Sequence, residues 1–199
     1  MENNWQKEII LDGNLVRLEP LQISHKKELI EAAKDGELWK LWYTSVPNEE
    51  TTENFIKTAL LNKEKGEQIP FVIIDKKSNK VIGTTRFMNM EPENFRLEIG
   101  HTWYAKSFQK TGVNTECKYL LLQYTFEKMN CIAVEFRTHW HNLASRNAIL
   151  RLGAKQDGIL RNHSISKNGV LRDTVVFSII NSEWKTVKFG LEHKMEKTY

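Results

Sequence analysis

Residues 109–116 combine residue types that suit the binding of an anion. An apolar helical face begins at Val113, so a helix is expected to start just after Gly112. The first turn of a helix has four backbone N–H groups without intrahelical partners, and it lies at the positive end of the helix dipole. Lys110 adds a full positive charge beside this turn. We therefore expect the segment to bind a phosphate group.

Two common phosphate-binding motifs are missing from this turn. A dinucleotide-binding fold needs G-x-G-x-x-G, but positions 110 and 115 are not glycine. A P-loop needs G-x-x-x-x-G-K-[ST], which the segment also lacks. Hydride transfer with a dinucleotide and nucleotide hydrolysis are therefore both disfavoured.

The elements around the turn can be predicted from the hydrophobic pattern. Strands are expected over residues 15–21, 71–75, 81–88, 96–104, 132–138, 156–165 and 170–180. Helices are expected over residues 24–34, 51–66, 113–128 and 142–152, and a fifth begins at residue 182. Ser24 would cap the first helix, Gly153 would end the fourth, and Asn168-Gly169 would turn a hairpin. The pattern predicts an α/β (α+β) fold, with one mixed, mostly antiparallel sheet and helices on both faces.

Composition narrows the class of protein. The 199 residues are 40% hydrophobic and 27% charged, which fits a single domain over residues 1–199. No apolar run reaches the roughly 18 residues of a membrane span, and the first residues do not resemble a signal peptide, so a cytoplasmic protein is expected. The net charge of +4 comes from dispersed Lys and Arg, so we expect no nucleic-acid surface. Cys117 and Cys131 lack metal-site spacing and are expected to be small buried residues.

The turn and a second block of residues resemble one protein family. Gln109-x-x-Gly112-x-Asn114 resembles the Q/R-x-x-G-x-G/A pyrophosphate turn of the GNAT superfamily of acetyl-CoA-dependent N-acetyltransferases. Residues 115–127 resemble the ribosomal-protein N-terminal acetyltransferase (RimJ/RimL-like) branch, and residues 142–154 resemble its N-x-x-S…LGA signature. The resemblance covers about residues 13–190. Asn114 departs from the usual Gly or Ala.

The resemblance implies a GNAT-like fold and acetyl transfer from acetyl-CoA to an amine acceptor. The acceptor would be a protein N-terminus or a small-molecule amine, and the chain could form a homodimer. Coenzyme A would contact the backbone of Trp103, and Asn142 would hydrogen-bond the pantetheine arm, cap the following helix, or do both. The turn residues that would bind the cofactor are Gln109, Lys110, Thr111, Gly112, Val113, Asn114 and Thr115.

Glu98 and Ser145 are the candidate catalytic residues. Glu98 could take the proton of the amine, directly or through water. It could equally be a solvated strand carboxylate paired with Arg96 or Arg86. Ser145 could hold or protonate the leaving sulfur, or be an ordinary serine in the first helical turn. Ile149 occupies the position where many family members carry a tyrosine acid.

Several other side chains have a structural interpretation that we favour over a functional one. Glu116 would complement the dipole of its helix. His139 and His141 lack an evident third ligand, so a surface pair is favoured over a zinc site. Trp42 lies in an aromatic helical face with its neighbours Trp39 and Tyr43, and core packing is favoured over a wall of the acceptor site.

Some features of the sequence leave alternatives open. Arg161 and His163 could line the acceptor cleft or face solvent. A non-catalytic acyl-CoA-binding or sensing domain would keep residues 109–115 but would need no base. A polyamine or aminoglycoside acetyltransferase would need an acidic cleft, which a net charge of +4 does not encourage.

Overall fold

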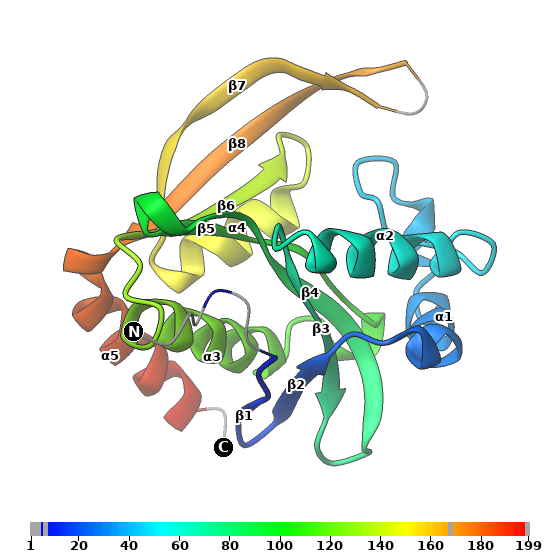
Figure 1. Cartoon of the computed structure of the whole chain (residues 1–199), viewed down its shortest axis with the longest axis horizontal. Helices are drawn as coiled ribbons and strands as arrows, with labels where there is room; N and C mark the ends of the chain where they lie inside the picture. The colour runs from blue at the N-terminus through cyan, green and yellow to red at the C-terminus, as the bar shows by residue number, and fades with distance from the viewer. Residues whose placement is uncertain (1–4, 6–7, 167–168, 198–199) are drawn as a thin grey trace.

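A computed structural model of the chain describes residue 5 and residues 8–166 and 169–197, and Figure 1 shows its arrangement. Within these residues, eight strands form one sheet in the order β1-β2-β3-β4-β5-β6-β8-β7. The strands are β1 (Leu11–Asp12), β2 (Val16–Pro20), β3 (Ile69–Asp75), β4 (Lys80–Glu91), β5 (Arg96–Tyr104), β6 (Ala133–His139), β7 (Lys155–Ile165) and β8 (Leu171–Ile180). The α-helices are α1 (Lys26–Lys34), α2 (Thr52–Glu64), α3 (Val113–Glu127), α4 (Leu143–Leu152) and α5 (Asn181–Glu196). The predicted α/β fold with a mixed sheet is confirmed.

Helices cover both faces of the sheet. Successive strand residues point to opposite sides, so each strand can bury one set of side chains against each layer of helices. In β3, Phe71 and Ile73 pack in one buried cluster with Leu121 of α3. Their neighbours Val72 and Ile74 pack in a second cluster with residues of α1 and α2. Figure 1 shows α3 and α5 running together on the first face, while α1 and α2 lie at the other end of the molecule. No helix in the described part of the chain combines the length and apolarity that a membrane span requires.

The pairing of β5 changes along its length, and this change shapes the centre of the sheet. Thr84 of β4 pairs with Trp103, but Arg86 pairs with Gly100, so β5 holds one extra residue in this interval. His101 lies in the extra segment with a φ of 49°. Such a β-bulge switches the faces of the following side chains. Leu97 and Ile99 therefore share a cluster with Tyr104, whereas Trp103 joins the opposite cluster.

The parallel pairing of β5 with β6 is short. Only Arg96–Glu98 of β5 pair with Ala133–Glu135 of β6, although β5 continues to Tyr104 and β6 to His139. A crossover helix is the usual link between parallel strands, and α3 provides it here. Beyond Glu98 the two central strands no longer pair, so their backbone groups at this point are available to other partners.

The sequence-based boundaries hold for most elements, with two differences near the N-terminus. Ser24 lies in a 3₁₀ turn over Ile23–His25, and α1 begins only at Lys26, so the prediction that Ser24 caps this helix is wrong. Strand β1 was not predicted, because two residues carry no periodic signal. Gly153 ends α4 with a φ of 102°, as predicted. Asn168 of the predicted hairpin turn lies outside the described residues, whereas Gly169 has a φ of 78°. Cys117 and Cys131 are both buried, as predicted.

Candidate functional site

Glu98 lies at the last paired position between β5 and β6, where the strands separate. Its side chain is buried, and Oε2 accepts a hydrogen bond of 2.7 Å from Nδ2 of Asn89. Nε of Arg137 lies 3.8 Å from the same oxygen. Arg96 pairs with Glu135 instead, at 3.1 Å. The interpretation of Glu98 as a solvated carboxylate paired with Arg96 or Arg86 is therefore wrong.

Its surroundings favour the protonated form of Glu98. The pKa of Glu98 is raised to about 7, mainly by burial, and the charge of Glu135 acts in the same direction. The charges of Arg137 and Arg172 act in the opposite direction, as does the hydrogen bond from Asn89. The carboxyl group borders a hollow of about 330 Å³. A carboxyl group with a pKa near 7 can both accept and release a proton at neutral pH.

The turn before α3 has the free hydrogen-bond donors that an anion site requires. Thr111 Oγ1 accepts the N–H of Val113 at 3.3 Å and donates to the carbonyl of Phe108 at 2.7 Å. Among the described residues, none accepts a hydrogen bond from the backbone N–H groups of Gly112, Asn114 and Thr115. The side chain of Val113 is buried in the core. The geometry of this turn therefore fits an anion bound by backbone N–H groups.

The residues just before this turn hold its backbone in place. Gln109 Nε2 donates to the carbonyl of Tyr104 at the end of β5, at 3.0 Å. Lys110 adopts a left-handed conformation with a φ of 61°, and its side chain is exposed. The Asn114 side chain is half-buried and has no hydrogen-bond partner in the described part of the chain, so it is free to face a ligand.

Replacement of Gly112 by valine should weaken cofactor binding selectively. Gly112 has a φ of −66° and a ψ of −18°, which every L-residue can adopt, so a side chain here should cost little backbone strain. A branched side chain should instead obstruct the approach of a phosphate to the N–H groups. We expect the dissociation constant of coenzyme A, measured by calorimetry, to rise at least about tenfold. Gly112→Ala should have a smaller effect, and unchanged affinity in Gly112→Val would refute this placement of the pyrophosphate.

Glu116 has a different role from the one predicted. It is buried, and its carboxylate accepts hydrogen bonds of 2.7 to 2.8 Å from the backbone N–H groups of Asn14, Leu15 and Val16. A Cβ atom at Gly13 would lie 2.6 Å from Cδ of Glu116, so a side chain at this position would displace the carboxylate from its hydrogen bonds. Glu116 therefore fixes the turn between β1 and β2 to the first turns of α3, which is more than complementing the helix dipole.

Asn142 and Ser145 lie at the start of α4. Oδ1 of Asn142 accepts the N–H of Ser145 at 3.1 Å, so Asn142 is the N-cap of this helix. The Ser145 hydroxyl is half-buried and has no hydrogen-bond partner in the described residues, which leaves it free for a ligand. The pantetheine role of Asn142 and the sulfur role of Ser145 stay predictions.

Trp103 lies on β5 beyond the bulge, opposite Thr84 of β4. Its carbonyl oxygen would lie only 2.1 Å from a Cβ atom at Gly83, so this carbonyl faces β4 rather than the open side of β5. The indole ring is buried in the cluster beneath α1 and α2. A contact between coenzyme A and the Trp103 backbone stays a prediction. The carbonyl of Trp103 is not the expected partner in this contact, because it faces β4.

The two histidines do not form the surface pair that we favoured. His139 is only 4% exposed, and its ring centroid lies 5.1 Å from that of Trp42, while His141 is exposed and lies 5.4 Å from the same indole. Trp42 itself is 54% exposed, so its predicted core packing is also wrong. Within the described residues, no group of three His, Cys, Asp or Glu could hold a metal ion. These rings form an aromatic wall, defined here as Trp42, Tyr43, His139 and His141.

Several charged residues of this region were not predicted from the sequence. Arg86 is buried on β4, and Arg172 is half-buried on β8. Lys118 of α3 is buried, and its Nζ donates to Thr102 Oγ1 in the bulge at 2.6 Å. Burial lowers the pKa of Lys118 to about 8. Buried cations are rare, and the sequence gives no sign that Arg86 and Lys118 are buried or that Arg172 is half-buried.

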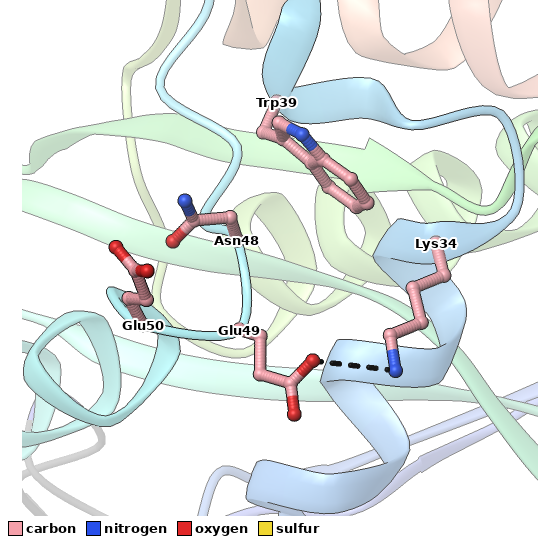
Figure 2. A pocket seen from close by; sticks show the side chains of 5 residues that line it. All are labelled: Lys34, Trp39, Asn48, Glu49 and Glu50. Atoms are coloured by element: carbon pink, nitrogen blue, oxygen red, sulfur yellow. Dashed lines mark ion pairs between the residues drawn. The ribbon is translucent and has the colours of Figure 1, made fainter.

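Arg161 does not have the unpaired guanidinium expected of a residue that binds a ligand. Its Nε lies 2.5 Å from Oδ2 of Asp173, and its side chain is 78% exposed. A second hollow, of about 220 Å³, lies apart from the central strands. Figure 2 shows it between α1 and the segment before α2, where Lys34 and Glu49 form an ion pair of 3.4 Å. Its two carboxylates, Glu49 and Glu50, are exposed rather than buried as Glu98 is, so we place the candidate active site at the separation of β5 and β6.

Comparisons with known proteins identify the family that has this fold. The acetyltransferase (GNAT) domain family matches residues 16–155. The chain therefore belongs to the GNAT family of acetyltransferases, and its enzyme class is N-acetyltransferase. It is 31% identical over 120 residues to the uncharacterized N-acetyltransferase p20 of Bacillus licheniformis, a match that covers 60% of this chain and 66% of that relative.

Solved structures of acetyltransferases share this fold. The structure of a GCN5-related N-acetyltransferase from Brucella melitensis has a TM-score of 0.83 and 31% identity, over 94% of this chain and 85% of that one. RimL, a ribosomal L7/L12 α-N-protein acetyltransferase in complex with coenzyme A, has a TM-score of 0.74 over 86% of this chain and 98% of that one. Its identity is only 20%, so this likeness concerns the fold alone.

Proposed function

We propose that this chain transfers the acetyl group of acetyl-CoA to a primary amine, with Glu98 as the general base. The observation that supports this proposal is the position of Glu98. It is a buried carboxyl group with a pKa of about 7, placed where the two central strands separate. A general base is most effective when its pKa lies near the working pH.

The reaction needs few protein groups. An α-amino group has a pKa of about 8 and a lysine amine about 10.4, so much of either is protonated at neutral pH. Glu98 removes the proton of the ammonium form, and the neutral amine then forms a bond with the acetyl carbon while the bond between this carbon and the coenzyme A sulfur breaks. The nitrogen then loses a second proton, which neutralises the departing thiolate. A thiol with a pKa of about 8.5 is an adequate leaving group. Ser145 is our candidate for stabilising or protonating the sulfur.

We assign the binding of coenzyme A to the turn before α3 and to the start of α4. The free N–H groups of Gly112, Asn114 and Thr115 would bind the pyrophosphate, and Lys110 would add a positive charge. Asn142 would contact the pantetheine arm in addition to capping α4. We also place the chain in the RimJ/RimL-like branch, on the basis of residues 115–127 and 142–154, with a protein N-terminus or a small-molecule amine as acceptor. A homodimer and a cytoplasmic location stay predictions.

The test is acetyl-CoA turnover measured by release of free thiol across a panel of amines, with the acetylated atom located by mass spectrometry. Turnover that depends on an added amine supports the enzyme. Tight binding of coenzyme A without turnover of any amine would instead favour the acyl-CoA-binding or sensing domain, which needs no base.

A further inference from the structure

Arg86 of β4 and Arg172 of β8 form no ion pair with a carboxylate among the described residues. Arg86 is 2% exposed, and Nη1 donates to Oε1 of Gln68 at 3.1 Å. Its Nε and Nη2 atoms are buried without any hydrogen-bond partner among the described residues. The guanidinium lies over the ring of Phe55 of α2, with its central carbon 4.3 Å from the ring centroid. A buried charge without a counter-ion is costly to the fold, so such a group is expected to serve a purpose.

Arg172 approaches the same region from β8. Its Nε donates to Thr174 Oγ1 at 3.2 Å, and Thr174 pairs with His139 at the end of β6. No carboxylate of the described residues forms an ion pair with Arg172. Its charge nevertheless acts on Glu98, on His101 and on His139. The strand register places Arg172 and Thr174, two positions apart on β8, on the face of the sheet that also carries His139 and Glu98.

His101 lies beside Phe55, the ring against which Arg86 packs, and it reaches solvent. It is in the β-bulge, its side chain is exposed, and its ring centroid lies 6.2 Å from that of Phe55. The surrounding protein, then the charges of Arg86 and Arg172, lower the pKa of His101 to about 4. This histidine is therefore neutral at pH 7, and the two guanidinium groups provide the local positive charge.

The positive charges of Arg86 and Arg172 favour an acceptor that carries a negative charge. A polyamine or an aminoglycoside would bring further positive charge against two guanidinium groups, which is unfavourable. A carboxylate would form an ion pair with Arg172, which no carboxylate of the described residues does, in hydrogen bonds that are stronger than neutral ones. Arg86, which is buried against the ring of Phe55, would strengthen the positive potential without contacting the acceptor directly. The aromatic wall beside Arg172 would pack against the remainder of the acceptor.

We infer that the acceptor is an amine that carries a carboxylate, which Arg172 binds while Glu98 receives the amine proton. This inference rests on the proposed acetyl transfer and specifies its substrate class. The carboxylate has two sources with the same chemistry. One is the α-carboxylate of a free amino acid, and the other is the acidic side chain of the second residue in a peptide.

The test compares matched acceptors that differ only in this charge. One arm uses free amino acids and their amides, and the other uses peptide amides with Asp or Asn as the second residue. We expect kcat/KM for the carboxylate to exceed that for the carboxamide by about 10- to 100-fold in one arm, because a charged hydrogen bond contributes that much. The arm that shows this preference identifies the source of the carboxylate.

Variants of Arg172 provide the control. Arg172→Gln should raise KM for the carboxylate acceptor and bring the two acceptors to similar kcat/KM. Because the charge of Arg172 also lowers the pKa of Glu98, the readout is the ratio of the two acceptors at one pH rather than either rate alone. Arg172→Lys should restore part of the preference. Arg161→Gln is the matched control, because this arginine is on the same hairpin but is already paired with Asp173. It should leave the preference unchanged.

The outcomes separate the two proposals. Equal use of carboxylate and carboxamide acceptors, a better reaction with polyamines, or an unchanged preference in Arg172→Gln would overturn the inference while acetyl transfer stands. If no amine is acetylated, calorimetry measures the binding of the same acceptor pairs to the chain loaded with coenzyme A. This measurement then tests the carboxylate site without turnover. Carboxylate binding that is lost in Arg172→Gln would support the anion site although the proposed function fails, and no such binding would reject both.

Discussion

Glu98→Gln is expected to lower kcat by at least about 100-fold, because general-base catalysis typically contributes that much or more. In the unmodified chain, kcat/KM should rise with pH through about 7, as the Glu98 carboxyl loses its proton. The variant should lose this pH dependence. Its affinity for coenzyme A should stay within about twofold, since the pyrophosphate turn is a separate element. Unchanged turnover across the pH range would remove Glu98 from the mechanism.

Glu135→Gln is the matched control for this prediction. Glu135 pairs with Glu98 in the parallel register and is also largely buried, but it forms ion pairs with Arg96 and Arg137. Its negative charge raises the pKa of Glu98. The substitution should therefore retain most of the turnover and move the pH dependence to lower pH. A loss of turnover as large as in Glu98→Gln would show that the charge network, rather than Glu98 alone, is required.

Stability gives a second measurement that does not depend on catalysis. The pKa of Glu98 is about 7 in the folded chain and 4.5 for an ordinary glutamate. Ionisation of Glu98 therefore lowers the free energy of unfolding. This loss of stability is absent below pH 4.5, grows as the pH rises through about 7, and is complete above that. It corresponds to about 3 kcal/mol. Glu98→Gln should match the unmodified chain at pH 4.5 and exceed its stability by up to this amount at pH 8.5 in denaturant titrations.

The sequence predicted the elements with strong periodicity and the turn before α3, because local patterns determine both. The predicted strand over residues 96–104 matches β5, and the helix expected over residues 113–128 matches α3 within one residue. Asn142 and Gly153 were also identified as caps from local chemistry. Each of these features depends on residues that lie within a few positions of one another.

The features that could not be predicted all depend on contacts between distant parts of the chain. The bulge at His101 is visible only from the pairing of β4 with β5. Arg86 and Arg172 lie 86 positions apart in number, yet the charge of each acts on His101. The exposure of Trp42 follows from a segment that forms only a 3₁₀ turn instead of the expected helical face. Neither hydrophobic period nor residue type contains this information.

Glu116→Ala should cause the largest loss of stability among the substitutions considered. It removes the acceptor of three backbone N–H groups, and a buried N–H without a partner costs about 1 to 3 kcal/mol. Because Asn14 and Leu15 are only partly buried and can regain water, we expect a total of about 3 to 5 kcal/mol in denaturant titrations. This is a large share of the roughly 5 to 15 kcal/mol that stabilise a typical domain.

Glu116→Gln separates the lost hydrogen bonds from the lost volume. The amide keeps one acceptor oxygen, so it can retain some of these bonds, and the loss should be about 1 to 2 kcal/mol. Glu64→Ala, on the exposed side of α2, should change stability by no more than about 0.5 kcal/mol. Because Glu116 ties the first turns of α3 to the turn between β1 and β2, Glu116→Ala should also weaken coenzyme A binding. A stability loss as small as that of Glu64→Ala would mean that other groups hold the turn between β1 and β2. This turn would then not depend on Glu116, a carboxylate about 100 positions away in the chain.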